Sequence, residues 1–274
     1  MPLGKVFLEV GTGRVPLIPL AYWLMGAKKK TITMDLNLYT KEELIKESLC
    51  YISENKEKVR NLFGSLLNKS RFNKLLDLEG KSEVAIQDFL TLCQIEYISP
   101  SDASNTHLSD ASIDFYTSNN VFEHIPKNTL KEIFNEGRRI TKDNGLCVHH
   151  IDYSDHFSHS DKNISAINFL QYGDIEWRKC ANNRYMYMNR MRHDGFIDLF
   201  ADSGCQIIKV KTNVDALSQT LLGSKNFISD EKFCSKTNKI LAITDVWIAT
   251  QEKELSDPTK FYSSILIKNC DVDF

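Results

Sequence analysis

The sequence predicts an α/β fold built on a mostly parallel sheet with helices on both faces, and three stretches of the chain carry this prediction. Residues 6–10 form a short apolar run that ends in a glycine turn, residues 11–13. A second such run, residues 31–34, ends in an aspartate, and a third, residues 112–119, ends in polar residues. An apolar segment with helical character, residues 15–26, separates the first two runs, which gives the strand–helix–strand order of a parallel sheet.

The glycine turn and Asp35 predict a nucleotide-cofactor pocket. Because glycine has no Cβ and tolerates positive φ, the turn at Gly11, Thr12 and Gly13 lets the backbone bend sharply and approach a ligand closely. The carboxylate of Asp35 stands where it can accept hydrogen bonds from both hydroxyls of a ribose, and Leu36 follows it. We therefore expect all five residues to contact the cofactor.

Glu9 and Pro16 help to decide whether such a pocket binds NAD or S-adenosylmethionine. A dinucleotide fingerprint requires a third glycine, G-x-G-x-x-G, and this chain has Pro16 in its place. Glu9 stands two residues before the first glycine, where its negative charge opposes a pyrophosphate and suits a ligand that carries an ammonium and a sulfonium. The residues thus favour S-adenosylmethionine over NAD, and an NAD-dependent oxidoreductase is the less favoured alternative.

The length of 274 residues suits a single α/β domain, residues 1–274, with insertions. Residues 40–94 are charged and helically periodic, and they predict a helical insertion between the second and third strands that covers a substrate pocket.

Residues 94–98 are the expected third strand. In its exit loop we expect Asp102 and Ala103 to contact the cofactor, with Asp102 accepting a hydrogen bond from an adenine amino group. Capping of the next turn is an equally weighted alternative for Asp102.

The later elements follow from periodicity and from glycine stops. Helices are expected at residues 130–140 and 196–203, the second ending at Gly204. Strands are expected at residues 146–151, 205–210 and 241–250, with a turn at residues 143–145 before the first of them. Residues 213–239 are polar without a clear pattern, and an apolar run at residues 262–267 has no assigned place in the fold.

Composition argues against several classes of protein. The net charge of −2 gives no overall attraction for nucleic acid, and the lysine run at residues 28–30 is typical of a solvated loop. The seven cysteines are scattered and lack C-x-x-C spacing, so neither a disulfide framework nor a cysteine zinc site is indicated. An uninterrupted apolar stretch of about 18 residues is missing. We expect a soluble, cytoplasmic protein without a membrane span, and the sequence leaves the oligomeric state open.

The block at residues 112–126 makes the expected cofactor more specific. Its apolar strand, the polar pair Asn119 and Asn120, and the following Phe-Glu-His-Ile resemble the methyltransferase stretch that ends in Leu-Glu-His-Ile. The E-x-G-x-G turn, Asp35 and Asp102 stand in the same order and at the same spacing as in that family. The chain therefore resembles the class I S-adenosylmethionine-dependent methyltransferases.

This resemblance implies a Rossmann-like sheet of seven strands, mostly parallel with an antiparallel last strand, and S-adenosylmethionine as cofactor. It also implies that Asn119 and Asn120 line the methionine side of the cofactor, that Asp114 is structural, and that His124 shapes the pocket wall rather than acting as a base. Proteins of this fold usually carry helices ahead of the first strand. Because this chain begins a few residues before that strand, it is either naturally short or starts inside a longer reading frame.

The carboxyl end of the fifth strand carries the largest group of chemically active side chains: His149, His150, Asp152, Tyr153, Asp155, His156 and His159. A histidine near its ordinary pKa of about 6.5 can take a hydroxyl proton at neutral pH. Our first choice of catalytic base is His156 oriented by Asp152, and the second choice is His150. The alternative is that these histidines pack against the strand end and hold loop backbone.

The same group of side chains has the donors for a divalent ion, because imidazole and carboxylate both bind such metals. Its spacing matches no established site, however. Class I enzymes that need magnesium take carboxylates from the loop after the fourth strand, where this chain has two asparagines. The sequence therefore predicts no metal.

Residues 151–165 and 189–193 resemble those of a bacterial methyltransferase subgroup often associated with surface-polysaccharide gene clusters. The resemblance rests on the signatures D-Y-x-D-H-[FY]-x-H and N-R-[ML]-R, together with the opening G-T-G-x-x-P. Residues 153–195 are expected to form a substrate-side insertion. The function expected is methyl transfer to a small-molecule or saccharide acceptor, with oxygen as the favoured methyl acceptor. A non-catalytic S-adenosylmethionine-binding module is the alternative.

Within this insertion we expect two arginines and several aromatic residues to bind the acceptor: Arg190, Arg192, Tyr153, Trp177, Tyr185 and Tyr187. Guanidinium groups bind phosphate and carboxylate, and aromatic faces stack on sugar rings. The alternative is that the arginines are surface charges.

Overall fold

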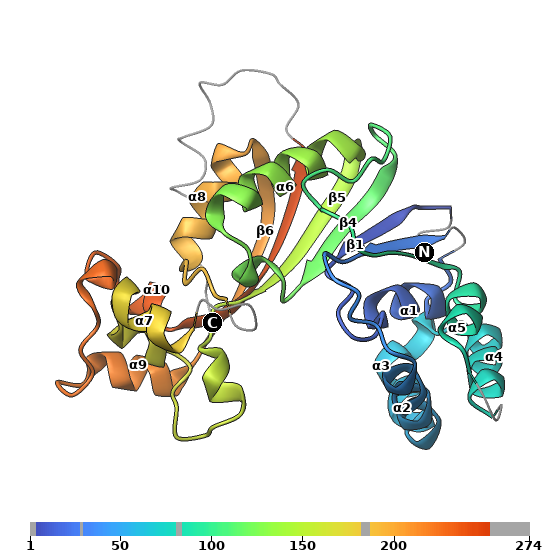
Figure 1. Ribbon diagram of the computed structural model, residues 1–274, viewed down its shortest axis with the longest axis horizontal. Helices are drawn as coiled ribbons and strands as arrows, with labels where there is room; N and C mark the ends of the chain where they lie inside the picture. The colour runs from blue at the N-terminus through green and yellow to red at the C-terminus, as the bar shows by residue number, and fades with distance from the viewer. Residues whose placement is uncertain (1–3, 28–29, 81–83, 182–186, 253–274) are drawn as a thin grey trace.

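The computed structural model describes residues 4–27, 30–80, 84–181 and 187–252. Lys28 and Lys29 of the lysine run, Tyr185 and the apolar run at residues 262–267 lie outside the described residues. The described strands form one seven-stranded sheet with the order β3-β2-β1-β4-β5-β7-β6 (Figure 1). They are β1 (Phe7–Val10), β2 (Thr31–Met34), β3 (Ile95–Ile98), β4 (Ile113–Asn119), β5 (Thr141–Asp152), β6 (Cys205–Val214) and β7 (Ile243–Glu252).

The strand directions confirm the expected sheet. Strands β1 to β5 pair in parallel with their neighbours, and β7 pairs antiparallel with both β5 and β6. All four residues of β1 are buried, as is usual for a central strand of a parallel sheet that is covered on both faces. The Rossmann-like, mostly parallel architecture with an antiparallel last strand is therefore confirmed.

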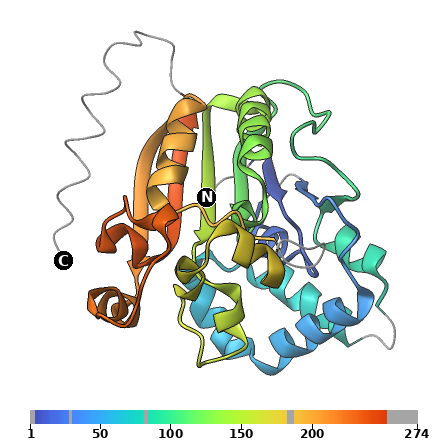
Figure 2. The ribbon, with the colours of Figure 1, turned by 60° about the vertical axis from the view of Figure 1, so that its left-hand side comes forward.

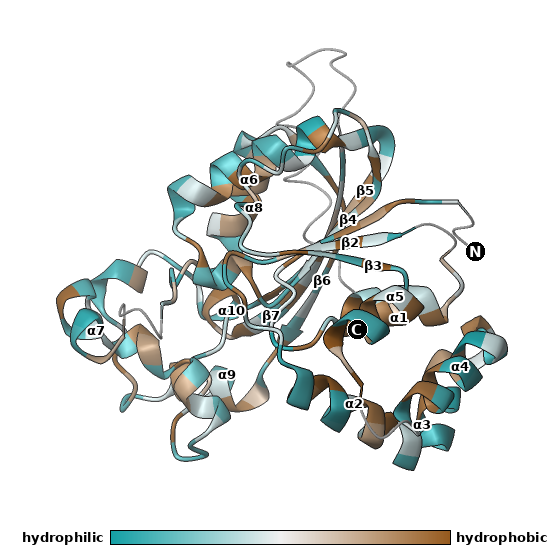
Figure 3. Ribbon diagram, turned by 45° about the vertical axis from the view of Figure 1, so that its right-hand side comes forward, coloured by the Kyte–Doolittle hydropathy of each residue, from teal (hydrophilic) through white to brown (hydrophobic). Residues whose placement is uncertain are grey.

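Helices cover both faces of this sheet. The described helices are α1 (Leu17–Leu24), α2 (Glu42–Glu54), α3 (Lys56–Phe63), α4 (Lys69–Glu79), α5 (Ile86–Leu92), α6 (Lys127–Ile140), α7 (Asp174–Cys180), α8 (His193–Asp202), α9 (Ala216–Gly223) and α10 (Asn238–Leu241). Helices α6 and α8 lie on one face, and α1 and α5 lie on the opposite face beside β1 to β3 (Figure 3). Helices α2, α3 and α4, within the segment expected to be helical, lie beyond α1 and α5.

Three apolar clusters hold these layers together. The largest joins the sheet to α6 and α8 through residues such as Leu8, Phe134 and Phe200. The second joins α1 to α2, α4 and α5. The third joins the segment after β5 to α10 through Phe169, Trp177 and Leu241. In Figures 1 and 2 the segment after β5 and helices α7, α9 and α10 lie at the end of the sheet where β5 leaves it.

Two parts of the chain differ from the sequence prediction. The expected turn at residues 143–145 is a bulge inside β5, because Thr141 pairs with Ile113 and Leu146 already pairs with Phe115. The segment 213–239, which showed no pattern, contains α9 and the first half of α10. Within the described residues, no helix is long and apolar enough to span a bilayer.

Candidate active site

The glycine turn after β1 is held against the end of β2. The amide of Gly11 donates to the carbonyl oxygen of Met34 (2.8 Å), and Gly11 has a φ of 89°. A Cβ at this position would stand 2.2 Å from Cγ2 of Val121, so a side chain does not fit here. Gly13 has a φ of 66°, but a Cβ there would meet no described atom within 4 Å. The backbone of Gly13 therefore faces space that a ligand can occupy.

Asp35 lies beside this open backbone. Its Oδ2 accepts a hydrogen bond from the amide of Gly13 (2.9 Å), and its Oδ1 accepts one from the amide of Asn37 (3.1 Å). The carboxylate is partly exposed at the carboxyl end of β2. This placement fits the expected ribose contact, which stays a prediction. The neighbouring Leu36 is 66% exposed, and its cofactor contact also stays a prediction.

Glu9 is buried beneath the glycine turn. Its Oε2 accepts a hydrogen bond from Oγ1 of Thr33 (2.7 Å), which lies 2.7 Å from Oγ1 of Thr12. Burial raises the pKa of Glu9 to about 8, even though the hydrogen bond from Thr33 lowers it. Near neutral pH, Glu9 is therefore mostly protonated in the free protein. The permanent negative charge expected from the sequence is wrong, because burial disfavours the charged form.

Asp102 caps the loop in which it stands. Its Oδ1 accepts hydrogen bonds from the amide and from Oγ of Ser104, both at 2.8 Å. The turn-capping alternative therefore describes its contacts within the protein, and the adenine contact stays a prediction. Ala103 is half-buried and packs against the largest apolar cluster.

Asn119 and Asn120 form the turn at the carboxyl end of β4. Asn120 has a φ of 55°, a left-handed conformation that asparagine tolerates better than most residues. Its amide donates to the carbonyl oxygen of His150 (3.0 Å), which fixes the turn to β5. Val121, the next residue, contacts the glycine turn at Gly11. The carboxyl ends of β1, β4 and β5 thus meet at the expected cofactor residues.

The predicted base and its orienting carboxylate lie together at the end of β5. Oδ2 of Asp152 lies 3.5 Å from Nε2 of His156 and 3.4 Å from Nε2 of His159, while Oδ1 accepts a hydrogen bond from the amide of Ser154 (2.7 Å). Burial opposes the charge of Asp152, but the interactions with His156 and Ser154 outweigh burial and hold the pKa of Asp152 below its usual value. Asp152 is therefore ionised and can orient His156.

His150, the second choice of base, has a different partner. Its Nε2 lies 3.1 Å from Oδ1 of Asp245 on β7, and its ring stacks on Trp247 with centroids 4.5 Å apart. His149 is buried among aromatic rings, and burial lowers its pKa to about 3. The packing alternative therefore applies to His149.

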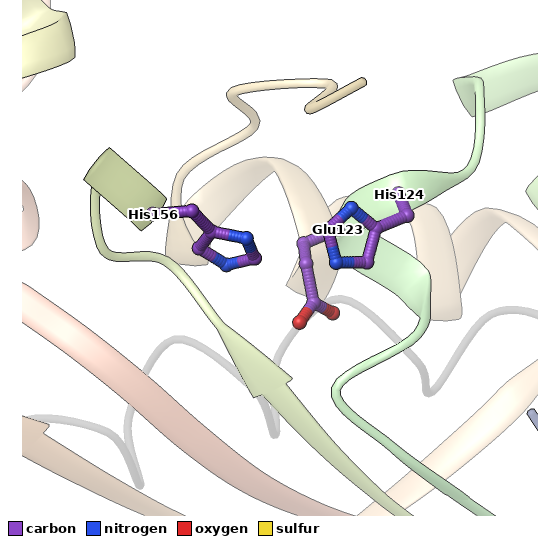
Figure 4. Close-up of side chains that lie close together, drawn as sticks. All are labelled: Glu123, His124 and His156. Carbon is purple, nitrogen blue, oxygen red and sulfur yellow. The ribbon is translucent and has the colours of Figure 1, made fainter. Parts of the chain in front are cut away.

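Glu123 is a site residue that the sequence analysis missed. It lies in the one-turn helix Phe122–His124 directly after β4 and is 2% exposed, and neither of its carboxylate oxygens has a hydrogen-bond partner among the described residues. Figure 4 shows its carboxylate beside the rings of His124 and His156. The acidic residue and histidine directly after a buried strand were the available signal, but the sequence does not reveal the burial of Glu123.

Burial shifts the pKa values of Glu123 and of its neighbour His124. Burial raises the pKa of Glu123 to about 8, and the negative charge of Asp152 adds to the rise. Backbone amides of Glu123 and Asp152 lie near the carboxyl group without forming regular hydrogen bonds, and they offset only part of this effect. Burial also lowers the pKa of His124, so its neutral form is favoured.

The expected roles of Arg190 and Arg192 in acceptor binding are wrong. Arg192 is 1% exposed, and its guanidinium donates to the carbonyl oxygens of Tyr153 (2.6 Å), Leu241 (2.8 Å) and Ile243 (2.5 Å). Arg190 is 4% exposed and donates to the carbonyl oxygens of Phe169 and Tyr172 and to Asp174. The guanidinium of Arg192 is thus occupied by backbone carbonyl groups, and that of Arg190 by two carbonyl groups and the carboxylate of Asp174.

Tyr153 and Trp177 are likewise buried and do not make the expected contacts with an acceptor. Each side chain is 2% exposed. Trp177 belongs to the apolar cluster of the segment after β5, with the guanidinium of Arg190 over its ring at 5.1 Å from the centroid. The ring of Tyr153 stacks on Phe196. Neither ring presents a face to an acceptor, because both complete the packing of this segment.

Comparison with known proteins agrees with the site. A family model described as a methyltransferase domain matches residues 80–149, which include Asp102, Asn119 and Asn120. No protein of curated function is similar enough to the chain to match it.

Several solved structures resemble the chain at low sequence identity. A geranyl diphosphate C-methyltransferase from Streptomyces coelicolor is 11% identical with a TM-score of 0.46, over 91% of this chain and 72% of that one. Phosphoethanolamine N-methyltransferase 2 from Haemonchus contortus is 12% identical with a TM-score of 0.48, over 93% and 50%. A SAM-dependent methyltransferase from Methanosarcina mazei is 13% identical with a TM-score of 0.48, over 90% and 92%.

The family match covers β3, β4 and most of β5, and the glycine turn and Asp35 lie outside it. The glycine turn and Asp35 nevertheless lie at the ends of β1 and β2, where the sequence resemblance predicts them. The sheet that carries them has the expected strand order and direction. The match over residues 80–149 and the strand order therefore agree with a methyltransferase domain, in line with the resemblance of the sequence to the class I S-adenosylmethionine-dependent methyltransferases.

Proposed function

We propose that the chain transfers the methyl group of S-adenosylmethionine to a hydroxyl oxygen of a small-molecule or saccharide acceptor. We name the ends of β1, β2 and β4, with residues 11–13, Asp35 and residues 119–120, the cofactor side. We name the end of β5, with Asp152 and His156, the acceptor side. The observation that carries the proposal is the pair formed by Asp152 and His156, because it provides an oriented base on the strand next to β4.

The roles of the residues follow from their positions. S-adenosylmethionine supplies a methyl group on a positively charged sulfur, so the protein contributes mainly alignment and exclusion of water. Asp35 holds the ribose, and Asn119 and Asn120 line the methionine side. Neutral His156 takes the proton of the acceptor hydroxyl at a ring nitrogen, while Asp152 orients the ring and stabilises the charge that forms there. The side chain of His156 is 17% exposed, and its Nε2 is buried without a hydrogen-bond partner among the described residues.

The saccharide alternative comes from the sequence resemblance, and the arginines expected to bind an anionic acceptor are buried. A cytoplasmic location and the lack of a nucleic-acid partner stay predictions of the sequence.

Calorimetric titration tests the cofactor. We expect S-adenosylmethionine and S-adenosylhomocysteine to bind and NAD to give no heat. Binding of NAD alone would favour the oxidoreductase, and binding of S-adenosylmethionine without transfer to any hydroxyl acceptor would favour the non-catalytic module.

Substitution of His156 tests the base. We expect His156→Ala to keep its affinity for S-adenosylmethionine and to lower turnover by about 100-fold or more, as loss of a general base does. His150→Ala is the matched control, because His150 lies on the same strand end but pairs with Asp245. If His150→Ala lost turnover and His156→Ala kept it, the role of base would pass to His150.

A further inference from the structure

Three side chains near the end of β5 are of the types that bind metal ions. Glu123 and His124 follow β4, His156 follows β5, and their potential ligand atoms all lie within 4.8 Å of one another (Figure 4). Donors that bind one tetrahedral zinc ion at about 2.0–2.1 Å stand roughly 3.4 Å apart, so side-chain movements of about 1 Å would close this set. We propose that Glu123, His124 and His156 bind a divalent first-row transition metal ion such as Zn²⁺.

The carboxyl group of Glu123 is the strongest observation for this site. The side chain is buried, its carboxylate lies within 4.8 Å of a ring nitrogen of each histidine, and neither of its oxygens has a hydrogen-bond partner among the described residues. A buried polar group without a partner costs about 1–3 kcal/mol, and folded proteins retain such groups where an ion or a ligand satisfies them. A dication satisfies the carboxylate, and the nearby charge of Asp152 adds to the attraction for a cation.

The tautomer of His124 fits a ligand. Its Nδ1 lies 2.8 Å from the carbonyl oxygen of Tyr187. Because a carbonyl oxygen only accepts hydrogen bonds, Nδ1 carries the hydrogen and Nε2 carries the free lone pair. Histidines that bind metals commonly donate their other ring N–H to a backbone carbonyl, which fixes the direction of the ring.

A second set of side chains, Asp152, His156 and His159, has the same composition but fits less well. Nε2 of His159 lies 2.9 Å from Oγ of Ser154. One oxygen of Asp152 already accepts a hydrogen bond from the backbone. This set therefore has partners within the protein, whereas the carboxyl group of Glu123 has none in the described part of the chain. In the proposed site Asp152 remains beside His156 as a neighbouring carboxylate.

The site revises the expectation that the chain binds no metal. That expectation rested on the asparagines at positions 119 and 120, and the structure brings in a carboxylate from position 123 instead. Three protein ligands leave a coordination position open, and a hydroxyl oxygen bound there has a lower pKa. When the ion is bound His156 is a ligand, so its action as the base in the proposed function applies to the metal-free protein. This role toward the acceptor rests on the proposed function, whereas metal binding does not.

Calorimetric titration of the full chain with ZnCl₂, after removal of metals by a chelator, tests the site without cofactor or acceptor. We expect one Zn²⁺ per chain, with Co²⁺ binding visible as new absorption bands, and no heat from Mg²⁺ because imidazole suits transition metals better. Glu123→Gln and His124→Gln should each weaken Zn²⁺ binding by at least about tenfold. His159→Gln is the matched control and should bind as tightly as the unmodified chain.

Glu123→Gln keeps the shape of the protonated carboxyl group that the free protein already holds near neutral pH, so this variant should fold, and a thermal melt checks that it does. Lack of stoichiometric Zn²⁺ binding would overturn the proposal. Loss of binding in His159→Gln but not in Glu123→Gln would also overturn it, in favour of the second set. Because the titration contains no acceptor, failure of methyl transfer leaves its result unchanged and bears only on the proposed function.

Discussion

The cofactor side and the acceptor side both contain a buried glutamate, and the two glutamates differ in their partners. On the cofactor side Glu9 accepts a hydrogen bond from Thr33, which lies beside Thr12. On the acceptor side neither oxygen of Glu123 accepts a hydrogen bond from a described residue. Burial raises the pKa of both to about 8. The first carboxyl group is satisfied by the chain itself, and the second is left for a partner from outside.

The two sides also differ in how far apart their partners lie in the sequence. The cofactor side connects Glu9, Gly11 and Gly13 to Thr33 and Asp35, which all belong to one strand–helix–strand unit. The acceptor side depends on contacts between distant segments, such as Arg192 with Leu241 and Ile243. We therefore expect substitution of a ligand-facing side chain such as Asp35 to change ligand affinity, whereas substitution at a buried or tightly packed position, such as Arg192 or Gly11, changes stability. Four predictions test it, from the largest expected effect to the smallest.

Arg192→Met should lower the free energy of unfolding by about 4 kcal/mol, because it leaves three buried carbonyl oxygens without a donor at roughly 1–3 kcal/mol each. Denaturant unfolding measures the change. Arg178→Met on α7 removes an exposed guanidinium from the same segment and should change stability little. A stable Arg192→Met protein with impaired acceptor binding would instead restore the role in acceptor binding that we have corrected.

Asp35→Ala should weaken S-adenosylmethionine binding by about 100-fold, because two hydrogen bonds to a charged acceptor are lost. Calorimetry gives the affinity. Asp102→Ala should have a smaller effect, since the adenine contact expected of Asp102 is one hydrogen bond instead of two. The reverse order of the two effects would assign the ribose contact to a different residue.

Gly11→Ala should lower the free energy of unfolding by about 2 kcal/mol, because the new Cβ combines an unfavourable positive φ with a collision at Val121. Gly13→Ala meets only the unfavourable φ and should cost about 1 kcal/mol. Paired denaturation curves compare the two variants. Equal losses would mean that Val121 moves aside at little cost.

Glu9 should make S-adenosylmethionine binding depend on pH. Its pKa of about 8 in the free protein means that it carries a proton at pH 7, and a positively charged ligand favours the ionised form. Binding then releases a proton, so affinity should rise by up to about tenfold per pH unit below pH 8 and level off above it. The ligand's own ammonium affects the unmodified chain and Glu9→Gln alike. The difference between their pH profiles therefore isolates Glu9, and identical profiles would contradict this role.

The fold and the cofactor side could be predicted from the sequence because their signals are local. The glycine turn, the apolar strands and Asp35 are read within short windows, and the strand order follows from the family resemblance. In the sequence, residues 143–145 resemble a turn. Their place in a bulge depends on how β5 pairs with β4, and β4 lies outside the short stretch of sequence from which a turn is predicted.

The acceptor side could be predicted only in part. The pairing of Asp152 with His156 follows from their spacing after one strand. Arg190 and Arg192 look like ligand-binding arginines in the sequence, and only the carbonyl groups of distant segments, to which they donate, reveal their structural role. Glu123 was overlooked for the same reason, because the residues that bury it are not its neighbours in sequence.

The contacts of Arg192 have a consequence for synthesis of the protein on the ribosome. Its guanidinium holds the carbonyl oxygen of Tyr153 at the exit of β5, but two of its other partners, Leu241 and Ile243, are translated about 50 residues later. A nascent chain that ends before Leu241 contains all the strands of the cofactor side and lacks two of the three carbonyl groups that bind this arginine. The growing polypeptide can therefore complete the cofactor side first and stabilise the acceptor side only after the last strand has emerged.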